Sequence, residues 1–228
     1  MRLLTFRFDD GFMEGARKSA AILDPYKASY FIVGDRTLGL AHLDGNPVLR
    51  GRDFGSVEEW RAMARDGHDI QPHSYSHRPL STLSSSEIEA EIRNSVRIVR
   101  SIGDGPVLFG FPFNDLVGGL DWSGLGVDAA GFDTRTSADP IQFNHSPIDD
   151  RFRIRSWAVR ERDWPTIEAE LAAVPEGTWT VLGFHSLDDE GFEPWSSDGF
   201  RKLVRLAGEL GFDIVTAREA LARTGSRS

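Results

Sequence analysis

Short apolar runs alternate with stretches of helical periodicity along almost the whole chain. The runs suit buried strands and lie at 3–8, 28–33, 69–74, 107–113, 129–134, 152–159, 179–184 and 213–215. Helical spacing of apolar residues marks 13–23, 57–65, 164–174, 200–210 and 217–222, with another helix opening at Ser84. The stretches 35–56 and 136–150 lack both patterns and are predicted to be long loops. This alternation, without long internal repeats, predicts an α/β protein built on a parallel sheet or a barrel.

The composition narrows the class of protein. At 228 residues the chain is long enough for one sizeable core, so we expect a single domain over 1–223 with a flexible tail at 224–228. The formal net charge is -9, from 26 Lys and Arg against 35 Asp and Glu. That balance argues against a nucleic-acid partner or an anionic membrane surface. The chain has no cysteine, which leaves His, Asp and Glu as strong metal ligands.

The N-terminus carries no visible secretory signal. Met1 and Arg2 precede only a short apolar stretch, which Arg7 interrupts before an acidic pair. A signal peptide needs a longer apolar segment and a small-residue cleavage site, and no run reaches transmembrane length. We therefore expect a cytoplasmic protein without a membrane partner. The sequence does not reveal the oligomeric state.

Candidate catalytic groups follow three of the predicted strands. Asp9 and Asp10 end the first strand, His73 and His77 follow the third, and His185 follows the strand at 179–184. In a parallel α/β barrel, functional groups collect where strands end at their C-terminal side. Alone, Asp-Asp-Gly is read as a turn, but two adjacent carboxylates repel each other unless a cation or proton separates them. Together the segments predict a shared site.

The histidine spacing suits a metal ion. His73 and His77 are four residues apart, so a helical turn or tight loop can direct both at one ion. A carboxylate with two imidazoles makes a three-ligand set that leaves positions open for water and substrate. Amide hydrolysis needs an activated water, a polarised carbonyl and a proton for the nitrogen, which metal, Asp and His can supply. An isolated pair of histidines with this spacing is a weak indication of a metal site. Its combination with Asp9, Asp10 and His185 at predicted strand ends makes the indication strong.

This set of motifs resembles the NodB-type polysaccharide deacetylases, carbohydrate esterase family 4. The segments that match the family, in chain order, are Phe8-Asp9-Asp10-Gly11, Ala28–Val33, Gly67–Ile70, His73-Ser74-Tyr75-Ser76-His77, Leu182-Gly183-Phe184-His185 and Phe212–Thr216. The resemblance covers nearly the whole domain. It implies a distorted (β/α) barrel of seven or eight strands, and hydrolysis of an N-acetyl or other N-acyl amide on an amino sugar or sugar conjugate.

The resemblance also implies a role for each matching residue. Asp10, His73 and His77 would bind one divalent metal ion, most often zinc, with cobalt, nickel or manganese as alternatives. Asp9 would be the general base that deprotonates a metal-bound water. His185 would be the acid that protonates the leaving amine. The expected substrate is a small-molecule or oligosaccharide N-acyl compound.

The third family motif departs from its usual form. An arginine that orients the catalytic Asp normally stands where this chain has Gly110, although the backbone N–H of Phe113 can still serve as an oxyanion donor. Strand alternation puts Arg7 on the same face as Asp9, about 6.6 Å away. We therefore hypothesise that Arg7 replaces the missing arginine. The alternative is that Arg7 points outward and pairs elsewhere.

Three further residues are supporting or substrate-binding candidates. Asp163 and Trp164 stand where the family has an Asp that supports the catalytic His, although a plain helix N-cap explains Asp163 equally well. Leu182 belongs to the motif that ends in His185. Two other functions stay open: hydrolysis of a small non-sugar amide or cyclic imide on the same fold, and a non-catalytic sugar-binding relative.

Overall fold

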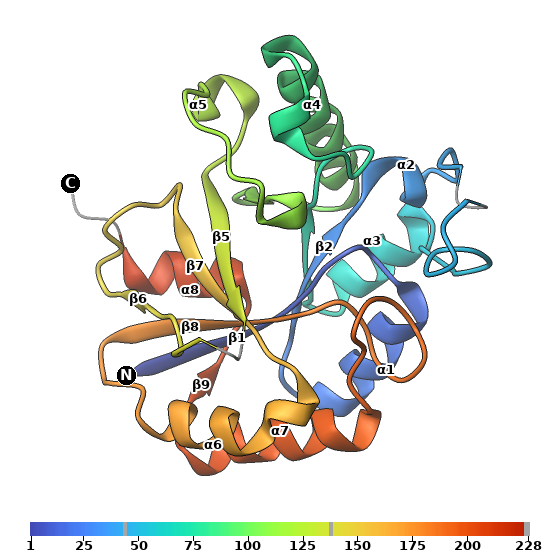
Figure 1. The fold of residues 1–228 in the computed structure, drawn as a ribbon. Helices are drawn as coiled ribbons and strands as arrows, with labels where there is room; N and C mark the ends of the chain where they lie inside the picture. The colour runs from blue at the N-terminus through green and yellow to red at the C-terminus, as the bar shows by residue number, and fades with distance from the viewer. Residues whose placement is uncertain (43–44, 137–138, 226–228) are drawn as a thin grey trace.

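A computed structural model describes residues 1–42, 45–136 and 139–225 of the chain, and Figure 1 shows helices around the outside of a set of strands. The strands are β1 (Arg2–Phe8), β2 (Ser29–Ile32), β3 (Asp69–Pro72), β4 (Leu108–Gly110), β5 (Ala129–Thr136), β6 (Asn144–His145), β7 (Ile154–Ala158), β8 (Thr178–Phe184) and β9 (Asp213–Ile214). The α-helices are α1 (Met13–Leu23), α2 (Gly34–Thr37), α3 (Val57–Arg65), α4 (Ser85–Ile102), α5 (Trp122–Leu125), α6 (Trp164–Ala172), α7 (Ser197–Glu209) and α8 (Ala217–Thr224). Short 3-10 turns are η1 (Leu80–Thr82), η2 (Pro112–Asn114) and η3 (Glu161–Asp163).

Seven strands form one continuous parallel path. Their order is β3-β2-β1-β8-β7-β5-β4, while β9 adds to β1 in parallel and β6 adds to β8 in antiparallel orientation. The ends of this path, β3 and β4, approach each other, so the sheet is nearly closed. The predicted distorted barrel is confirmed, with β6 and β9 as short additions to the seven-strand path.

The alternation of β1 divides the core in two. Phe6 and Phe8 point outward and pack against Phe200 of α7, with ring centroids 5.3 Å and 5.5 Å apart. The intervening side chains point into the barrel, where Leu3 joins a second apolar cluster and Thr5 accepts a hydrogen bond from Trp179 Nε1 at 2.9 Å. Because side chains alternate along a strand, Arg7 and Asp9 share this inner face.

Polar side chains close the gap between β3 and β4. The side-chain amide of Gln71 accepts the N–H of Leu108 at 2.8 Å and donates to Pro106 O at 3.2 Å. Two residues after Gln71, just past the end of β3, His73 Nδ1 lies 3.0 Å from Gly110 O of β4. These side chains take the place of a backbone ladder, so barrel closure and the position of His73 depend on the same contacts.

Helix α8 lies at the starts of the strands. The Ala217 N–H donates to Ser29 Oγ at 2.8 Å, and Arg218 Nη2 lies 3.3 Å from the buried carboxylate of Asp69. The helix runs to Thr224, whose hydroxyl donates to Ala220 O at 2.8 Å. Thr224 therefore belongs to the helix rather than to the predicted tail, and the rest of that tail at 226–228 lies outside the described residues.

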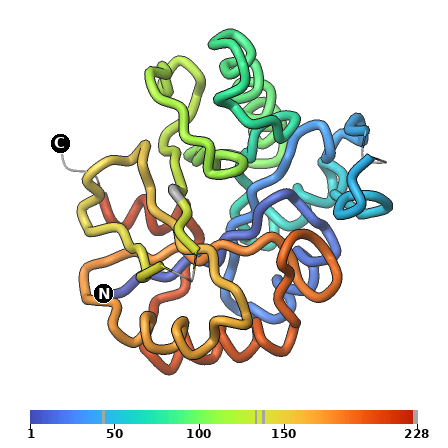
Figure 2. The backbone as a smooth tube through the Cα atoms, viewed as in Figure 1, coloured from blue at the N-terminus to red at the C-terminus, as the bar shows by residue number. Residues whose placement is uncertain are grey.

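Local chemistry explains where elements differ from expectation. The predicted strand at 107–113 ends at Gly110 because Pro112 has no backbone N–H for a ladder and opens η2. The predicted loop at 136–150 holds β6, and α2 begins just before the loop at 35–56. Figure 2 shows the N-terminal end beside the segment that leads into β8, where Gly177 N–H donates to Met1 O at 3.0 Å. No described helix is long and apolar enough to cross a membrane.

Buried His68 makes stability depend on pH. Burial, assisted by the charge of Lys27 and opposed by that of Asp66, lowers the pKa of His68 to about 4. Its Nδ1 accepts the N–H of Ala28 at 3.1 Å. Since an unfolded histidine titrates near pH 6.5, the unfolded chain binds the proton first. The free energy of unfolding should therefore be fully retained above about pH 6.5 and fall by up to about 3 kcal/mol as the pH drops toward 4.

Urea unfolding at pH 7.5 and 5.0 checks this expectation. The wild type should lose more stability between the two values than His68→Gln, in which this site carries no titratable group. His145 is exposed, so His145→Gln should follow the wild type. An equal loss in His68→Gln would show that His68 does not titrate in the way its burial implies.

Candidate active site

The first strand delivers two carboxylates to the open end of the barrel. Phe8 pairs with Tyr30 on one side and Phe184 on the other, and the Asp9 N–H donates to Phe184 O at 2.9 Å. Asp10 then turns the chain, with φ of 72°. Asp tolerates this left-handed conformation better than most residues. The turn lets neighbouring carboxylates face the same cavity from one strand end.

The third strand delivers His73 in a defined tautomer. Its backbone N–H donates to Ile32 O at 2.9 Å, which extends the pairing of β2 with β3. Its Nδ1 lies 3.0 Å from Gly110 O, and a carbonyl can only accept, so Nδ1 carries the proton. Burial lowers the pKa of His73 to about 4. The ring is therefore neutral near pH 7, with the Nε2 lone pair available to a metal.

A tight loop, rather than a helical turn, brings His77 beside His73. Ser74 and His77 are both left-handed, with φ of 64° and 55°, and Ser74 Oγ accepts the His77 N–H at 3.0 Å. Buried Glu91 of α4 accepts the N–H groups of Tyr75 and Ser76 at 3.0 Å and 2.8 Å, and the Ser76 hydroxyl at 2.6 Å. One carboxylate thus holds the loop that carries both imidazoles. Sequence patterns did not identify Glu91, because its position on the helix face reveals nothing about the loop it contacts.

The donor set fits a divalent metal. One atom each from Asp10, His73 and His77 lie within 4.8 Å of one another, and His77 Nε2 is 2.9 Å from Asp10 Oδ1. Asp10 Oδ1 is buried and makes no hydrogen bond of good geometry to a described group, as expected for an atom that would face an ion. One carboxylate with two imidazoles suits zinc and related metals.

The charge of Asp10 is strongly favoured. Burial alone would raise its pKa, but the close contact with His77 Nε2 and the nearby charges of His77, His185 and Arg36 hold the pKa well below its usual range. Arg36 of α2 is almost fully buried, with Nη1 at 3.2 Å from Asp10 Oδ1 and its guanidinium 5.2 Å from the Phe54 ring centroid. The strand-end pattern did not identify Arg36, because α2 rather than a strand carries it and its role depends on the contact with Asp10.

Arg7 contacts Asp9 inside the barrel. Its Nε lies 2.7 Å from Asp9 Oδ1, and only 2% of the residue is exposed. The guanidinium sits between Phe31 and Phe132, at 4.9 Å and 4.8 Å from their ring centroids. An added Cβ at Gly110 would lie 2.7 Å from Phe31 Cδ1 and 3.2 Å from Arg7 Nη2. Residues 7 and 9 therefore share one face as predicted, and Arg7 occupies space that a side chain at 110 would need.

His185 completes the set from the end of β8. It lines the same cavity as Asp9 and Asp10. Its ring stands nearly perpendicular to that of Phe192, with centroids 5.6 Å apart. Among the described residues no side chain hydrogen-bonds to the His185 ring, so it has no partner of the kind that Asp163 was expected to be.

The structure does not bring the other candidates to this cavity, except Phe113. Phe113 lines it and stands against the His77 ring at 4.5 Å. Leu182 is fully buried in the outer core because the next residue, Gly183, faces the cavity. Asp163 lies 4.0 Å from Arg162 at the start of α6, and Trp164 packs on Trp195 at 6.4 Å. Neither lines the cavity.

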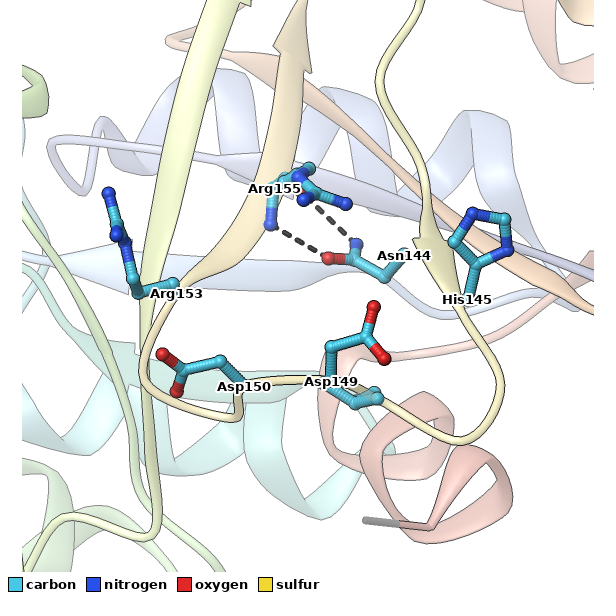
Figure 3. Close-up of a pocket in the computed structure, with 7 residues that line it drawn as sticks. Asn144, His145, Asp149, Asp150, Arg153 and Arg155 are labelled. Carbon is cyan, nitrogen blue, oxygen red and sulfur yellow. Dashed lines mark hydrogen bonds between the residues drawn. The ribbon is translucent and has the colours of Figure 1, made fainter. Parts of the chain in front are cut away.

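We call this space the strand-end cavity. It measures about 510 Å³, and its lining includes the charged and imidazole side chains of Arg7, Asp9, Asp10, Arg36, His73, His77 and His185. A smaller cavity of about 340 Å³ opens beside the start of β7, shown in Figure 3. There Asn144 Oδ1 accepts the Arg155 N–H at 2.8 Å, a contact that joins β6 to β7. That cavity lies at the opposite strand end from the catalytic groups.

Comparison with known proteins gives one matching family model and a set of solved structures with the same fold. A model described as polysaccharide deacetylase matches residues 2–116. The chitin deacetylase of the fungal pathogen Colletotrichum lindemuthianum is 20% identical, with a TM-score of 0.63 over 96% of this chain and 87% of that one. The Bc1960 peptidoglycan N-acetylglucosamine deacetylase is 20% identical, with a TM-score of 0.60 over 99% and 90%. Peptidoglycan deacetylase PdaC from Bacillus subtilis is 19% identical, with a TM-score of 0.58 over 97% and 90%. A search of curated protein sequences found no match.

Glu91 offers a test of how the histidine loop is held. Glu91→Ala should weaken Zn²⁺ binding about 10- to 100-fold, the usual effect of losing a group that positions metal ligands. Glu91→Gln should stay within a few-fold of the wild type, because its oxygen can accept both N–H groups while its amide donates to Ser76. Titration calorimetry with Zn²⁺ on protein whose fold is checked by circular dichroism measures this.

Glu89→Ala is the matched control. Glu89 lies on the same helix but is exposed and paired with Arg93 at 3.6 Å, so its loss should leave the affinity unchanged. Folded Glu91→Ala protein that binds Zn²⁺ as tightly as the wild type would refute the role of Glu91.

Proposed function

This chain belongs to the polysaccharide deacetylase family, and on that premise we propose that it removes an N-acetyl or other N-acyl group from an amino sugar or sugar conjugate. The observation that carries the proposal is the meeting of Asp9, Asp10, His73, His77 and His185 at one cavity. Structural relatives named as deacetylases of chitin and of peptidoglycan N-acetylglucosamine support an N-acetylated amino sugar as substrate. We further propose that residues 1–223 act as one catalytic domain. The cytoplasmic location stays a prediction.

Asp10, His73 and His77 would hold the divalent ion, and zinc is the ion we propose. When bound, it supplies Lewis-acid polarisation of the amide carbonyl and lowers the pKa of water. The neutral His73 ring and the ionised Asp10 carboxylate are already in the protonation states that ligation requires. Ligation by His77 Nε2 would replace its present contact with Asp10 Oδ1.

The remaining groups carry the protons. Asp9 takes a proton from the attacking water while the water oxygen bonds to the amide carbon. His185 gives a proton to the nitrogen as the C–N bond breaks, which releases the amine and a carboxylate. We assign the Phe113 N–H to the developing oxyanion. The Arg7 guanidinium holds Asp9 through Oδ1, which leaves Oδ2 to take the proton.

One observation favours a second candidate, hydrolysis of a small non-sugar amide or cyclic imide. Arg7 lies against Asp9 and Arg36 against Asp10, so each carboxylate has its own guanidinium. Charge balance therefore does not require a metal. Activity on cyclic imides by metal-free protein would favour this candidate over the deacetylase.

The role of Arg7 can be measured directly. Arg7→Met keeps an unbranched side chain between Phe31 and Phe132 but loses the contact with Asp9, so kcat/KM should fall about 100-fold with metal content unchanged. Arg7→Lys keeps the charge without the planar donor and should recover only part of the loss. Arg17→Met, at an exposed position in α1, controls for net charge. Turnover near the wild-type value in Arg7→Met would disprove the assignment.

Metal dependence needs its own experiment. Elemental analysis of the purified wild type should find about one divalent ion per chain, and Asp10→Ala should hold far less, because one of the three protein ligands is gone. A chelator should abolish hydrolysis of N-acetyl sugars and added Zn²⁺ should restore it. A wild type that holds no more metal than Asp10→Ala would remove the basis of the metal-dependent mechanism.

A further inference from the structure

Exposed apolar side chains gather at the mouth of the strand-end cavity. Among the described residues, the large apolar side chains with high exposure are Met1, Tyr26, Leu38, Leu40, Val48, Phe113 and Phe192. Three of them, Val48, Phe113 and Phe192, line this one cavity, together with half-buried Leu49. They come from three separate segments: the 35–56 loop, η2, and the loop that follows β8.

These side chains lie directly against the catalytic groups. Phe113 is 63% exposed, and its ring centroid is 4.5 Å from that of His77. Phe192 is 56% exposed, and its ring centroid is 5.6 Å from that of His185. One phenyl ring therefore stands beside a proposed metal ligand and the other beside the proposed acid. A group that covers both rings must be close to the bond that breaks.

Leaving these rings in water has a substantial free-energy cost. A phenylalanine buries at least about 150 Å² when covered, and more than half of each of these residues stays exposed to water, which is unfavourable in proportion to the apolar area. A ligand group that excludes water from both rings recovers that free energy. The C–H face of a sugar stacks on an aromatic ring, but it carries too little apolar surface to cover both rings together with the aliphatic Val48 and Leu49.

Another part of the cavity lining is polar. Thr134, Thr136 and Arg160 line it, with Asn114 Oδ1 accepting the Thr134 N–H at 2.8 Å. The lining therefore combines these hydrogen-bonding groups with an apolar wall, the name we give to the side chains of Val48, Leu49, Phe113 and Phe192. Such a cavity matches a ligand that is itself polar in one part and apolar in another.

We infer that the substrate is an amphiphilic amide, with an alkyl or aryl group beside the scissile bond in addition to its polar part. The inference rests on the proposed amide hydrolysis and specifies its substrate class. The apolar group has two possible sources: an acyl chain longer than acetyl, or an apolar substituent on the amine-bearing part. The wall contacts both His77 and His185, so it serves either source.

Two substrate series separate these sources. The first is glucosamine N-acylated with acetyl, butanoyl or hexanoyl groups, and the second is N-acetylglucosamine as its methyl, butyl or phenyl glycoside. In the series that fits, kcat/KM with the Zn²⁺-loaded enzyme should rise up to about fourfold per buried methylene, from about 0.8 kcal/mol each. If kcat/KM rises in neither series, the inference fails while hydrolysis of the acetyl methyl glycoside still upholds the proposed function. If no member is hydrolysed, the proposed function fails as well.

Variants of the wall connect the gain to the structure. Phe192→Ala and Val48→Ser should remove most of the gain for the apolar members, so that the ratio of kcat/KM between the longest and the shortest member of the series falls toward one. Leu40→Ala is the matched control, since Leu40 is 61% exposed but does not line the cavity. An equal loss for all substrates in Phe192→Ala and Val48→Ser would overturn the inference, because it would assign the wall a structural role.

Discussion

The ion pair between Arg7 and Asp9 is the interaction on which the inner half of the barrel depends. A guanidinium that is 2% exposed must be paired, since an isolated buried charge is far too costly to keep. Here the partner is the Asp9 carboxylate at 2.7 Å, and two phenyl rings hold the guanidinium in place. This arrangement requires Gly110, because a Cβ there would meet both Phe31 and Arg7. The arginine on β1 and the glycine on β4 therefore constrain each other.

Barrel closure and site geometry share their contacts. Strands β3 and β4 are joined through side chains, and one of these is His73, whose Nδ1 faces Gly110 O at 3.0 Å. The same contact that joins the strands also directs Nε2 toward Asp10. Gly110 thus takes part twice, by leaving room for Arg7 and by supplying the carbonyl for His73. A change in the closure of the barrel would move the site as well.

The sequence predicted those parts of the site that depend on strand ends. Asp9, Asp10, His73 and His185 directly follow strands, with His77 four residues after His73. Parallel strands bring their C-terminal ends together whatever the intervening helices do. That Arg7 and Asp9 share one face also needed only local information, the two-residue period of a strand, whereas the role of Arg7 was inferred from the arginine missing at position 110. The same period would have excluded Leu182, because Gly183 faces the cavity and its neighbour must face outward.

Arg36 and Glu91 could not be recognised in this way because their roles depend on contacts between distant segments. In the sequence, Glu91 is one of several acidic residues of an amphipathic helix. Its role becomes visible only in the structure, where α4 packs beside the loop at 74–77. The loop after β8 is a second example of a position that depends on contacts between distant segments. Glu190 in the following loop accepts the Gly15 N–H at 2.7 Å and the Ser186 hydroxyl at 2.9 Å, and a Cβ at Gly15 would clash with Ser186 Oγ. The loop with Phe192 is thus docked on the helix that follows Asp10. Strand ends supply the proposed catalytic groups, while docked loops supply the apolar side chains beside them.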